Sequence, residues 1–362
     1  MPVRVWPCWV FIAVAGCAGM DGRPTEAPLP LPDLPVVRPV AETEPVATPH
    51  DAADDAAIWI HPQDPSKSLV IGTDKQRGLH VYDLDGRTLQ TLLDGRLNNV
   101  DIRDGFLVNG RAMALVAASN RSNQSIALYL LDPESGRLAS AGDPVPTGFA
   151  DPYGLCMYAS PEGEYFVIVS NSDNGRFRQW RVRASGDDII ADRVREFRVG
   201  SQAEGCVADD ETGALYVAEE DGGFWKYRAS TDGGNVRREI DRVGGRTGLV
   251  ADIEGVAIWH GREGRGFIVL SNQGANSYAV YRREGDNAFV GLFRIGDDTE
   301  RDVDGVSVTD GLAVASQPLG PSYPNGVLVV QDGSNTPAGQ HQNFKYVSWR
   351  DVARALGVAG ED

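Results

Sequence analysis

A short signature headed by a polar residue recurs six times along the chain, at intervals of roughly 50 residues. In each copy the polar residue precedes a small or turn-forming residue and then a run of strand formers. The six copies begin at Asp54, Asn98, Tyr153, Glu204, Glu254 and Asp304. If equivalent strands converge on one axis, four carboxylates would lie together there, and such oxygen ligands suit Ca²⁺. The five histidines are scattered and show no spacing typical of zinc ligands.

The segments between the signatures predict β-hairpins. Each interval holds a strand, a polar loop and a second strand with an aromatic residue, as in residues 69–84 and 267–283. Short strands repeated at this period are typical of an all-β, six-bladed β-propeller with about four to five strands per blade. Residues 39–47 are rich in strand formers, and we expect this N-terminal strand to complete the last blade and close the ring. Residues 349–356 show a short helical pattern.

Composition and charge restrict the possible functions of the protein. The chain has 362 residues, and its 42 glycines and 21 prolines suit short strands joined by tight turns. The formal net charge of −17 argues against a nucleic-acid partner, because phosphate backbones are bound by basic surfaces. An acidic protein can still bind an anionic substrate where cations invert the local field. We expect a monomer.

The N-terminus predicts export. Arg4 precedes an apolar run over residues 5–15 that is too short to span a bilayer, and the run ends at Cys17. Residues 1–17 resemble a bacterial lipoprotein signal, with Cys17 lipidated; an ordinary secretory peptide is the alternative. Residues 18–38 are predicted to form a Pro-rich flexible tether, and residues 39–358 a single propeller domain. The protein is therefore expected in the periplasm or attached to the outer membrane, and otherwise secreted.

Two cysteines remain within the predicted propeller. Cys156 and Cys206 follow the signature glycines Gly154 and Gly205 at offsets that differ by one residue. Because strand side chains alternate between faces, the two sulfurs point to opposite faces of equivalent strands, and these faces can meet between neighbouring blades. An oxidising compartment then predicts a disulfide between the blades. Two buried free thiols are the alternative.

Two of the signatures also carry a family resemblance. Residues 51–59 (DAADDAAIW) and 98–103 (NNVDIR) resemble the signature motifs of the β-propeller phytases, which are calcium-dependent 3-phytases of bacteria. The resemblance continues in order through residues 204–205, 218–221, 252–255, 271–274 and 342–345, and so covers most of the chain. It implies a six-bladed propeller with a cluster of Ca²⁺ ions at one end of its channel, and release of phosphate from phytate, myo-inositol hexakisphosphate.

The resemblance also implies roles for individual residues. The catalytic positions are Asp54, Tyr153, Glu204, Glu220 and Glu254, and the positions that hold substrate phosphates are Lys75 and Arg121. Asp55 and the carbonyls of Ala56 and Val100 match one structural calcium site, and Asp298 and Asp332 match another. Together with the repeat, the resemblance gives these calcium ligands: Asp54, Asp55, Ala56, Val100, Glu204, Glu220, Asp252, Glu254, Asp298, Asp304 and Asp332.

Three positions depart from the family pattern. Ala56 replaces a proline, Ser172 replaces a lysine in the third hairpin loop, and Ser334 replaces an acidic residue. The change at Ser172 removes a phosphate contact, and the change at Ser334 removes a calcium ligand. Among the polar residues of the second signature, we expect Asn98 to shape its loop and Asp101 to orient it.

These observations lead to a hypothesis of direct hydrolysis. A water bridging Ca²⁺ ions held by Asp54, Glu204 and Glu254 would attack phosphorus, while Lys75 and Arg121 neutralise the developing charge. Two alternatives stay open. One is another propeller hydrolase, such as a lactonase or a broader phosphatase; the other is a non-enzymatic, calcium-binding surface lipoprotein.

Overall fold

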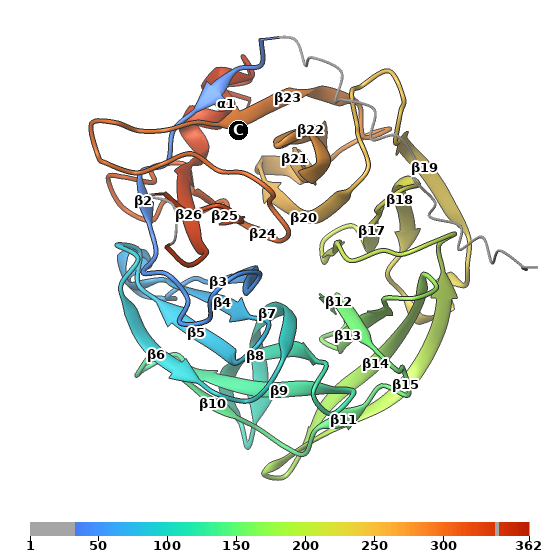
Figure 1. Cartoon of the computed structure of the whole chain (residues 1–362). Helices are drawn as coiled ribbons and strands as arrows, with labels where there is room; N and C mark the ends of the chain where they lie inside the picture. Colours follow the sequence, from blue (N-terminus) through green and yellow to red (C-terminus); the bar gives the residue numbers. More distant parts are fainter. Residues whose placement is uncertain (1–32, 337–339, 362) are drawn as a thin grey trace, which may run out of the picture. The chain divides into compact units, whose positions relative to one another are not determined.

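The computed structural model describes residues 33–336 and 340–361, within a compact unit that spans residues 32–362. Six sheets, antiparallel except for one short parallel pair, form a ring, as Figure 1 shows, so the predicted six-bladed propeller is confirmed. Their innermost strands line a central channel. The predicted signal peptide, Cys17 and most of the predicted tether lie outside the described residues. Within the described part of the chain, no helix has the length and apolar character needed to cross a membrane.

The first three blades follow one another along the chain, each with its innermost strand first. Blade 1 contains β3 (Ala53–Trp59), β4 (Leu69–Asp74), β5 (Gly78–Tyr82) and β6 (Thr88–Leu92). Blade 2 contains β7 (Leu97–Val108), β8 (Arg111–Asn120), β9 (Ser125–Asp132), β10 (Arg137–Ser140) and β11 (Val145–Pro146). Blade 3 contains β12 (Pro152–Ala159), β13 (Tyr165–Asn171), β14 (Arg176–Ser185) and β15 (Asp188–Arg198).

The last three blades include two strands from the N-terminal part of the described chain. Blade 4 contains β16 (Cys206–Asp209), β17 (Ala214–Glu219), β18 (Gly223–Arg228) and β19 (Arg237–Arg242). Blade 5 contains β20 (Ile253–His260), β21 (Gly266–Asn272), β22 (Ser277–Arg282), β23 (Phe289–Ile295) and β1 (Val36–Val37). Blade 6 contains β24 (Leu312–Ala315), β25 (Val327–Asp332), β26 (Asn343–Ser348) and β2 (Ala41–Glu42).

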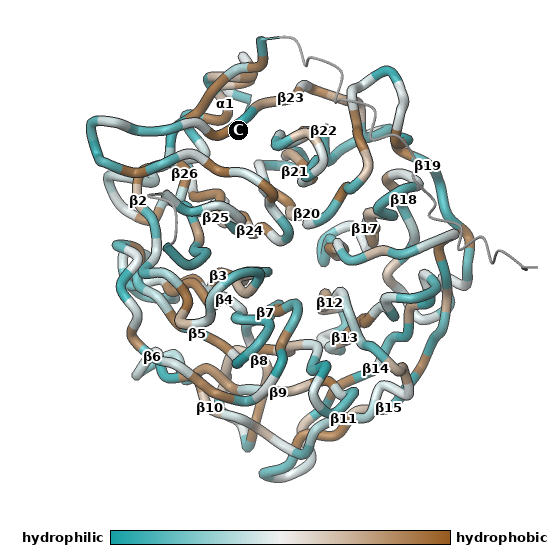
Figure 2. The backbone as a smooth tube through the Cα atoms, viewed as in Figure 1, coloured by the Kyte–Doolittle hydropathy of each residue, from teal (hydrophilic) through white to brown (hydrophobic). Residues whose placement is uncertain are grey.

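The predicted hairpins are the second and third strands of each blade, from β4–β5 to β25–β26. The predicted C-terminal helix is also present as α1 (Trp349–Ala355), whose Trp349 ring stacks on Trp259 at 5.4 Å between centroids. Four short 3-10 turns complete the elements: η1 (Pro65–Lys67), η2 (Thr231–Gly233), η3 (Arg262–Gly264) and η4 (Gln273–Ala275). Figure 2 shows the hydrophobic segments concentrated along the strands and the hydrophilic ones along the connections.

Ring closure involves two N-terminal strands rather than one. As predicted, β2 completes blade 6, with Ala41 opposite Tyr346 in an antiparallel pair. In addition, β1 pairs in parallel with β23 of blade 5, and Val37 is buried there. The predicted boundary of the tether at residue 38 is therefore wrong at its C-terminal end. Pairing both strands with blades that lie late in the sequence ties the start of the propeller to its end and covers two sheet edges.

One of the six predicted inner strands begins at a different residue. β24 begins at Leu312 and is preceded by Asp310 and Gly311, whereas Asp304 and Gly305 lie in the irregular connection after β23. The 50-residue interval favoured Asp304, but the connection from β23 to β24 is longer than its equivalents in the other blades. Asp310 is therefore the sixth equivalent of Asp54, and the assignment of Asp304 to that position is wrong.

The core consists of apolar layers between adjacent blades. One such cluster joins blades 1 and 2 and includes Trp59, Ile71, Val116 and Tyr129, each at most 1% exposed. Another joins blades 3 and 4 and includes the bonded pair Cys156 and Cys206. The Cα atoms of the two cysteines are 5.7 Å apart, on β12 and β16, and the pair is the one expected from the sequence.

Loss of this disulfide is expected to destabilise the propeller. The bond closes a loop with a sequence separation of 50. Without this bond the unfolded chain has more conformational entropy, which lowers the free energy of the unfolded state by about 4 kcal/mol. A Cys156→Ala/Cys206→Ala variant should therefore show a lower midpoint of guanidinium denaturation than the unreduced wild type. Rapid alkylation of both cysteines in the unreduced, denatured wild type would contradict the prediction.

Candidate metal and phosphate site

Carboxylates from different blades meet at one mouth of the channel, where the inner strands begin. Asp54 lies on β3, Glu204 lies two residues before the start of β16, and Glu254 lies on β20; all three are buried. Glu220 joins them from the hairpin loop after β17, and carboxylate oxygens of Glu204, Glu220 and Glu254 lie within 4.8 Å of one another. The structure thus brings together the four acidic residues predicted to bind catalytic Ca²⁺.

Glycines allow the inner strands to approach so closely. A Cβ atom on Gly154 would lie 1.9 Å from the carbonyl oxygen of Glu204, and one on Gly205 would lie 2.0 Å from that of Glu254. Gly255 is related in the same way to Asp310, at 2.8 Å. These separations are shorter than real contacts, so only glycine fits after Tyr153, Glu204 and Glu254. In these three signatures the close packing of adjacent inner strands requires the glycine.

The sequence analysis missed Asp310, which belongs to this group. Its Oδ2 atom accepts a hydrogen bond from Lys75 Nζ at 3.1 Å, and the same amine donates to Asp54 Oδ1 at 2.9 Å. Gln273 Nε2 also donates to Asp310. Asp310 could have been identified from the sequence by the Asp-Gly pair directly before the strand-forming residues 312–315.

Asn98 lies between the carboxylates rather than only shaping its loop. Its Nδ2 atom is 3.0 Å from Asp54 Oδ2 and 2.5 Å from Glu204 Oε1. Its Oδ1 atom accepts a hydrogen bond from Arg121 Nη1 at 3.0 Å. Asn98 therefore links the acidic cluster to Arg121, one of the two predicted phosphate-binding residues.

Mutual repulsion and burial perturb the acidic cluster. Burial raises the pKa of each of the carboxyl groups of Glu204, Glu254 and Asp310 well above the ordinary value for its type. The neighbouring carboxylates raise these pKa values further. Burial, with Asp252 and Asp221 nearby, raises the pKa of Glu220 to about 7. Glu220 Oε1 and Glu254 Oε2 are buried and have no hydrogen-bond partner. Buried, unpartnered carboxylate oxygens are stabilised by a cation, and a donor set of oxygens fits Ca²⁺.

Two cations and a tyrosine border the cluster, as the resemblance implied. Burial alone would lower the pKa of Lys75, but attraction to Asp54 and Asp310 outweighs burial and raises it. Arg121 lies with its guanidinium carbon 5.7 Å from the centre of the Tyr153 ring. Burial, and then the charge of Glu204, raise the pKa of the Tyr153 hydroxyl, which therefore stays protonated. Protonated Lys75, Arg121 and Tyr153 can all donate hydrogen bonds to a phosphate oxygen.

The channel below the mouth holds the first predicted structural site. Asp55 Oδ2 accepts hydrogen bonds from Val100 N at 3.1 Å and Asn99 Nδ2 at 3.2 Å. Asp55, Ala56 and Val100 line a cavity of about 200 Å³. Burial, and then Asp54, raise the pKa of Asp55 well above its ordinary value, as expected for a carboxylate that a cation would stabilise.

Asp101 has a different role from the one expected. It does not orient the loop of Asn98 and Asn99. Its Oδ2 atom accepts a hydrogen bond from Met157 N at 2.7 Å, and its Oδ1 atom binds Arg103 Nη1 at 2.9 Å. Asp101 therefore connects β7 to β12 of the next blade.

The second predicted structural site is only partly assembled. Asp332 and Asp304 lie around the fully buried amine of Lys345, with Asp332 Oδ2 at 3.6 Å from Lys345 Nζ. Asp298 instead accepts hydrogen bonds from the backbone of Glu300 and Arg301 in its own turn. The two predicted ligands therefore have different partners: Asp298 binds the backbone of its own turn, and Asp332 lies beside Lys345.

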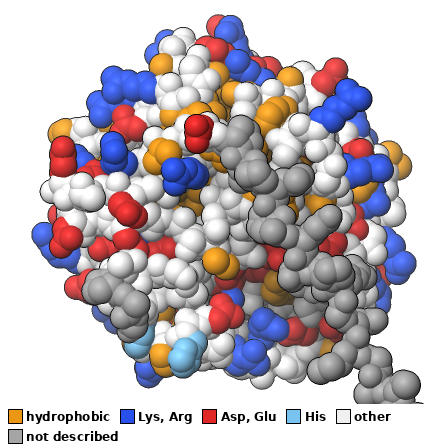
Figure 3. All heavy atoms as spheres, turned by 45° about the horizontal axis from the view of Figure 1, so that its top comes forward, with side chains coloured by type: hydrophobic (Ala, Val, Ile, Leu, Met, Phe, Trp, Pro, Cys, Tyr) orange, Lys and Arg blue, Asp and Glu red, His pale blue; other side chains and the backbone are white. Residues whose placement is uncertain are grey.

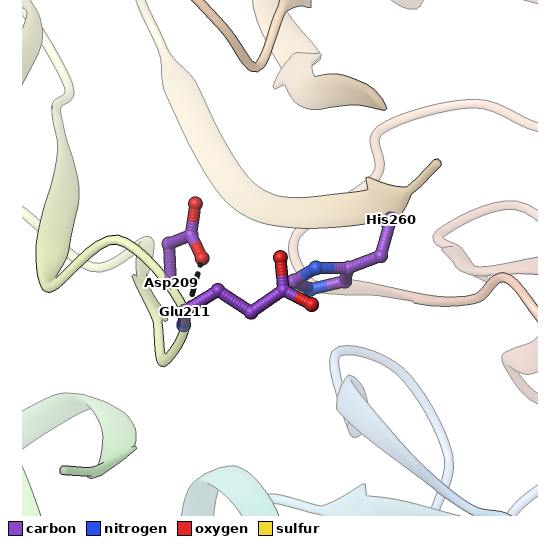
Figure 4. Close-up of side chains that lie close together, drawn as sticks. All are labelled: Asp209, Glu211 and His260. Carbon is purple, nitrogen blue, oxygen red and sulfur yellow. Dashed lines mark hydrogen bonds between the residues drawn. The ribbon is translucent and has the colours of Figure 1, made fainter. Parts of the chain in front are cut away.

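A further group with metal-ligand chemistry lies at the other ends of the inner strands. Figure 4 shows Asp209, Glu211 and His260, whose ligand atoms lie within 4.8 Å of one another. Both oxygens of Asp209 accept hydrogen bonds from Arg283, at 2.7 and 2.8 Å, and Glu211 accepts another from Arg283 at 2.6 Å. Because Arg283 already binds both carboxylates, we interpret the group as an ion-pair network.

The fold and the site define the class of protein. It is a six-bladed propeller with four buried carboxylates, the partly buried Asp310, two basic side chains and a tyrosine at one channel mouth. Figure 3 shows acidic and basic side chains intermingled over one face of the molecule. Lys75 and Arg121, the two predicted phosphate-binding residues, lie within a strongly acidic protein, next to a predicted cation site.

Sequence comparison then assigns the family. The family model described as Phytase matches residues 33–361. A 3-phytase of Bacillus subtilis (strain 168) is 45% identical over 324 residues, which cover 87% of this chain and 84% of the relative. The chain therefore belongs to the phytase family, and its resemblance to the β-propeller phytases is confirmed.

Solved structures of other proteins are similar only at a coarse level. A luciferin-regenerating enzyme has a TM-score of 0.49 at 11% identity, covering 84% of this chain and 94% of its own. BBS1N, solved in complex with ARL6DN, has a TM-score of 0.47 at 10% identity, covering 81% and 78%. Likenesses at these scores carry no argument about function.

The ion pair of Asp209 with Arg283 predicts a pH dependence of stability. Burial alone would raise the pKa of Asp209, but the hydrogen bonds from Arg283 outweigh burial and lower it. A depressed carboxyl pKa stabilises the fold above the unfolded value of about 4, and this stabilisation is lost as the pH falls through the folded value.

Asp209→Asn should therefore lower the free energy of unfolding by about 3 kcal/mol at pH 7, because it leaves Arg283 buried beside a neutral amide. In urea denaturation the difference from wild type should shrink as the pH falls below about 4. Asp188→Asn, at an exposed carboxylate, is the matched control. A difference that grows toward low pH would contradict the assignment.

Proposed function

We propose that this protein is a calcium-dependent 3-phytase that releases phosphate from phytate. The observation that carries the proposal is the group of buried carboxylates with unpartnered oxygens beside Lys75, Arg121 and Tyr153. Family membership and the name of the 45% identical relative support the substrate. An acidic mouth by itself repels a polyphosphate, so the proposal requires bound cations.

The proposed ligands are the carboxylates of Asp54, Glu204, Glu220, Glu254 and Asp310, with Asp252 close to Glu220. Ca²⁺ held there would neutralise these carboxylates and the substrate phosphate, and would make a nearby water more acidic. Asp55 with the carbonyls of Ala56 and Val100 would hold a structural Ca²⁺ in the channel. Asp304 and Asp332 are proposed ligands of a further structural site, where Lys345 already supplies one positive charge.

The remaining residues of the mouth orient the substrate. Lys75 is anchored by Asp54 and Asp310, so its ammonium group lies at the edge of the acidic cluster, within reach of a phosphate held there. Asn98 keeps Arg121 next to the same cluster. A protonated Tyr153 hydroxyl can donate to a phosphate oxygen but is a poor nucleophile, which supports direct attack by water over a phospho-enzyme.

We further propose export as a monomeric lipoprotein, with residues 1–17 as signal, Cys17 as lipidation site and the following segment as tether. The support is the apolar run over residues 5–15 and its position before Cys17. The protein would then be attached in the periplasm or to the outer membrane. Recovery of the wild type and a Cys17→Ser variant in the same soluble fraction would contradict the lipid anchor.

Replacing Glu204 tests the acidic cluster, because the change should lower activity with Ca²⁺ and raise stability without it. Glu204→Gln should lower phosphate release from phytate at saturating Ca²⁺ by about 100-fold, because a cation ligand is lost. In excess chelator the same variant should be more stable than wild type by about 1 kcal/mol, because one of several repelling buried carboxylates is gone. Phosphate assays and thermal denaturation measure the two effects. Glu162→Gln, at an exposed carboxylate, is the control, and full wild-type activity in chelator would contradict the proposal.

Replacing Asp310 with asparagine should mainly affect activity, whereas the same replacement of Asp304 should mainly affect stability. Asp310→Asn should lower kcat/KM for phytate by about 100-fold, because Asp310 lies in the cluster and holds Lys75. Asp304→Asn should keep kcat/KM within about threefold of wild type and mainly lower thermal stability, because it weakens the ion pairs of buried Lys345. Equal losses of activity would show that the two residues share one site.

A further inference from the structure

We propose that Lys226 and Arg238, on the two outer strands of blade 4, form a binding site for a phosphate group that is separate from the channel mouth. The ligand is a free phosphate or phosphate monoester, or the phosphate of a lipid headgroup. The inference goes beyond the proposed function, because neither residue belongs to the candidate metal and phosphate site. Its test does not depend on the reaction at the mouth.

Two basic side chains lie directly opposite each other in blade 4. Lys226 on β18 is paired with Arg238 on β19 in the antiparallel register, on the outer side of the blade in Figure 1. Both donate hydrogen bonds to one oxygen, Asn287 Oδ1, from Lys226 Nζ at 3.3 Å and from Arg238 Nη2 at 2.6 Å. Like charges directly opposite each other destabilise a sheet. A neutral oxygen compensates neither charge, so a bound anion would relieve their repulsion.

Asn287 is fixed so that its oxygen faces the two basic groups. Its side chain is 2% exposed, and its Nδ2 atom donates to the carbonyl oxygens of Arg282 at 3.0 Å and Arg283 at 2.8 Å, and to the hydroxyl of Tyr216 at 3.3 Å. Its backbone has a positive φ of 58°, which asparagine adopts more readily than most residues. The two basic side chains are therefore positioned before any ligand binds, which lowers the entropy lost on binding.

The other charges near the pair do not neutralise it. The negative charges that act on Lys226 are those of Asp209 and Asp286. Asp209 is already bound through both of its oxygens by Arg283. Asp286 is exposed, and its backbone carbonyl accepts a hydrogen bond from Arg238 Nη1 at 3.2 Å. Within the described part of the chain neither Lys226 nor Arg238 forms an ion pair, so two cations face one free carboxylate.

The neighbouring basic side chains of the same strand do have carboxylate partners. On β19, Arg237 pairs with Glu219 at 3.7 Å, and Arg242 pairs with Glu239 at 2.7 Å. The protein has a formal net charge of −17, so carboxylates are abundant. Two adjacent cations without such a partner are therefore unusual in this molecule and favour an external anion.

Partial burial makes the missing counter-ion more costly. Lys226 is half-buried, with Nζ 5.3 Å from the centre of the Tyr216 ring. Burial, and then the charge of Arg238, lower the pKa of its ammonium group. A phosphate between the two residues would raise that pKa, because an opposite charge favours the charged form. Arg238 is exposed, so a ligand can reach the pair from solvent.

The free donors of the pair suit a tetrahedral oxyanion. A guanidinium group has five N–H donors and an ammonium group has three. Arg238 uses two in the hydrogen bonds described and Lys226 uses one, which leaves three and two for a ligand. Hydrogen bonds from such groups to phosphate are charge-assisted and therefore strong.

The pair lies away from the channel mouth. Successive antiparallel strands connect alternately at the two ends of a blade. Glu220 and Gln273, which belong to the mouth, lie in the β17–β18 and β21–β22 connections, whereas Asn287 lies in the next connection, between β22 and β23. Arg283, in that same connection, binds Asp209 of the group in Figure 4. A ligand held by the pair would therefore leave the mouth free.

NMR can test the site directly, because the chain has only four lysines: Lys67, Lys75, Lys226 and Lys345. Protein labelled with ¹³C at lysine Cε is titrated with inorganic phosphate in excess chelator, and sodium chloride at equal ionic strength is the reference. We expect a saturable shift of the Lys226 signal and a rise in its pKa. Lys67, which is exposed, should move no more than in chloride, and Lys75 reports any binding at the mouth.

Three variants test the roles of the charges. Arg238→Gln should raise the dissociation constant of phosphate at Lys226 by about tenfold, because a charge-assisted contact is lost while a donor to Asn287 remains. Asp286→Asn should lower it by about two- to threefold, because the one free carboxylate nearby is removed. Arg242→Gln removes a charge on the same strand that is already paired, and is the matched control. Thermal denaturation checks that each variant is folded.

A vesicle experiment separates the two sources of phosphate. The Cys17→Ser protein, which lacks the proposed lipid, is sedimented with phosphatidylglycerol vesicles and, for comparison, with phosphatidylcholine vesicles. Sedimentation with the anionic vesicles that is lost on adding Arg238→Gln would assign the site to a lipid headgroup. An NMR response to phosphate without sedimentation would assign it to a soluble phosphate.

The proposal is overturned if Lys226 responds to phosphate no more than to chloride and the anionic vesicles do not sediment the protein. Equal shifts of Lys226 and Lys67 would also overturn it, because they would show non-specific screening. The same holds if Arg238→Gln binds phosphate and anionic vesicles as well as the wild type does.

Discussion

Electrostatic repulsion among buried carboxylates is the constraint on which the site depends. Asp54, Glu204, Glu220, Glu254 and Asp310 come from several blades, and the propeller fold holds them together at one mouth of the channel. Burial removes the water that would screen their charges, and two of their oxygens have no hydrogen-bond partner. Lys75 compensates part of the charge, and the remainder is compatible with the bound cations that the proposed function requires. The ring must therefore be rigid enough to keep repelling groups in place.

Several features of the fold supply that rigidity. Glycines after the polar residues let adjacent inner strands approach at distances that any side chain would prevent. The disulfide between Cys156 and Cys206 joins blades 3 and 4 close to Glu204. At the other end of the channel, Arg103 with Asp210 and Arg283 with Asp209 join different blades through paired charges. The two ends thus differ in chemistry: carboxylates are paired with arginines at one end and are left in excess at the other.

The same principle explains why the cations at the mouth are restrained. In this strongly acidic protein, the two predicted phosphate-binding residues both have carboxylate partners: Lys75 has three, and Arg121 has Asp151. Such pairs orient the side chains for a ligand but reduce the charge that they present to it. Recognition of a polyphosphate then depends on bound cations and on the few N–H donors that remain.

The sequence by itself determined the architecture, because the period of the repeat and the alternation in its hairpins are local properties. The six blades, the closing strand β2, the helix α1 and the cysteine pair all follow from such patterns, and so do three of the five clustered carboxylates. The fourth, Glu220, followed from the family resemblance. The tertiary structure alone decided what depends on the length of a connection or on a partner far away in the chain. Asp310 replaced Asp304 because the connection before β24 is longer than the repeat suggested. The binding of Asp298 to the backbone of its own turn, and the engagement of Arg121 by Asp151 and Ser172, appeared only in the folded chain.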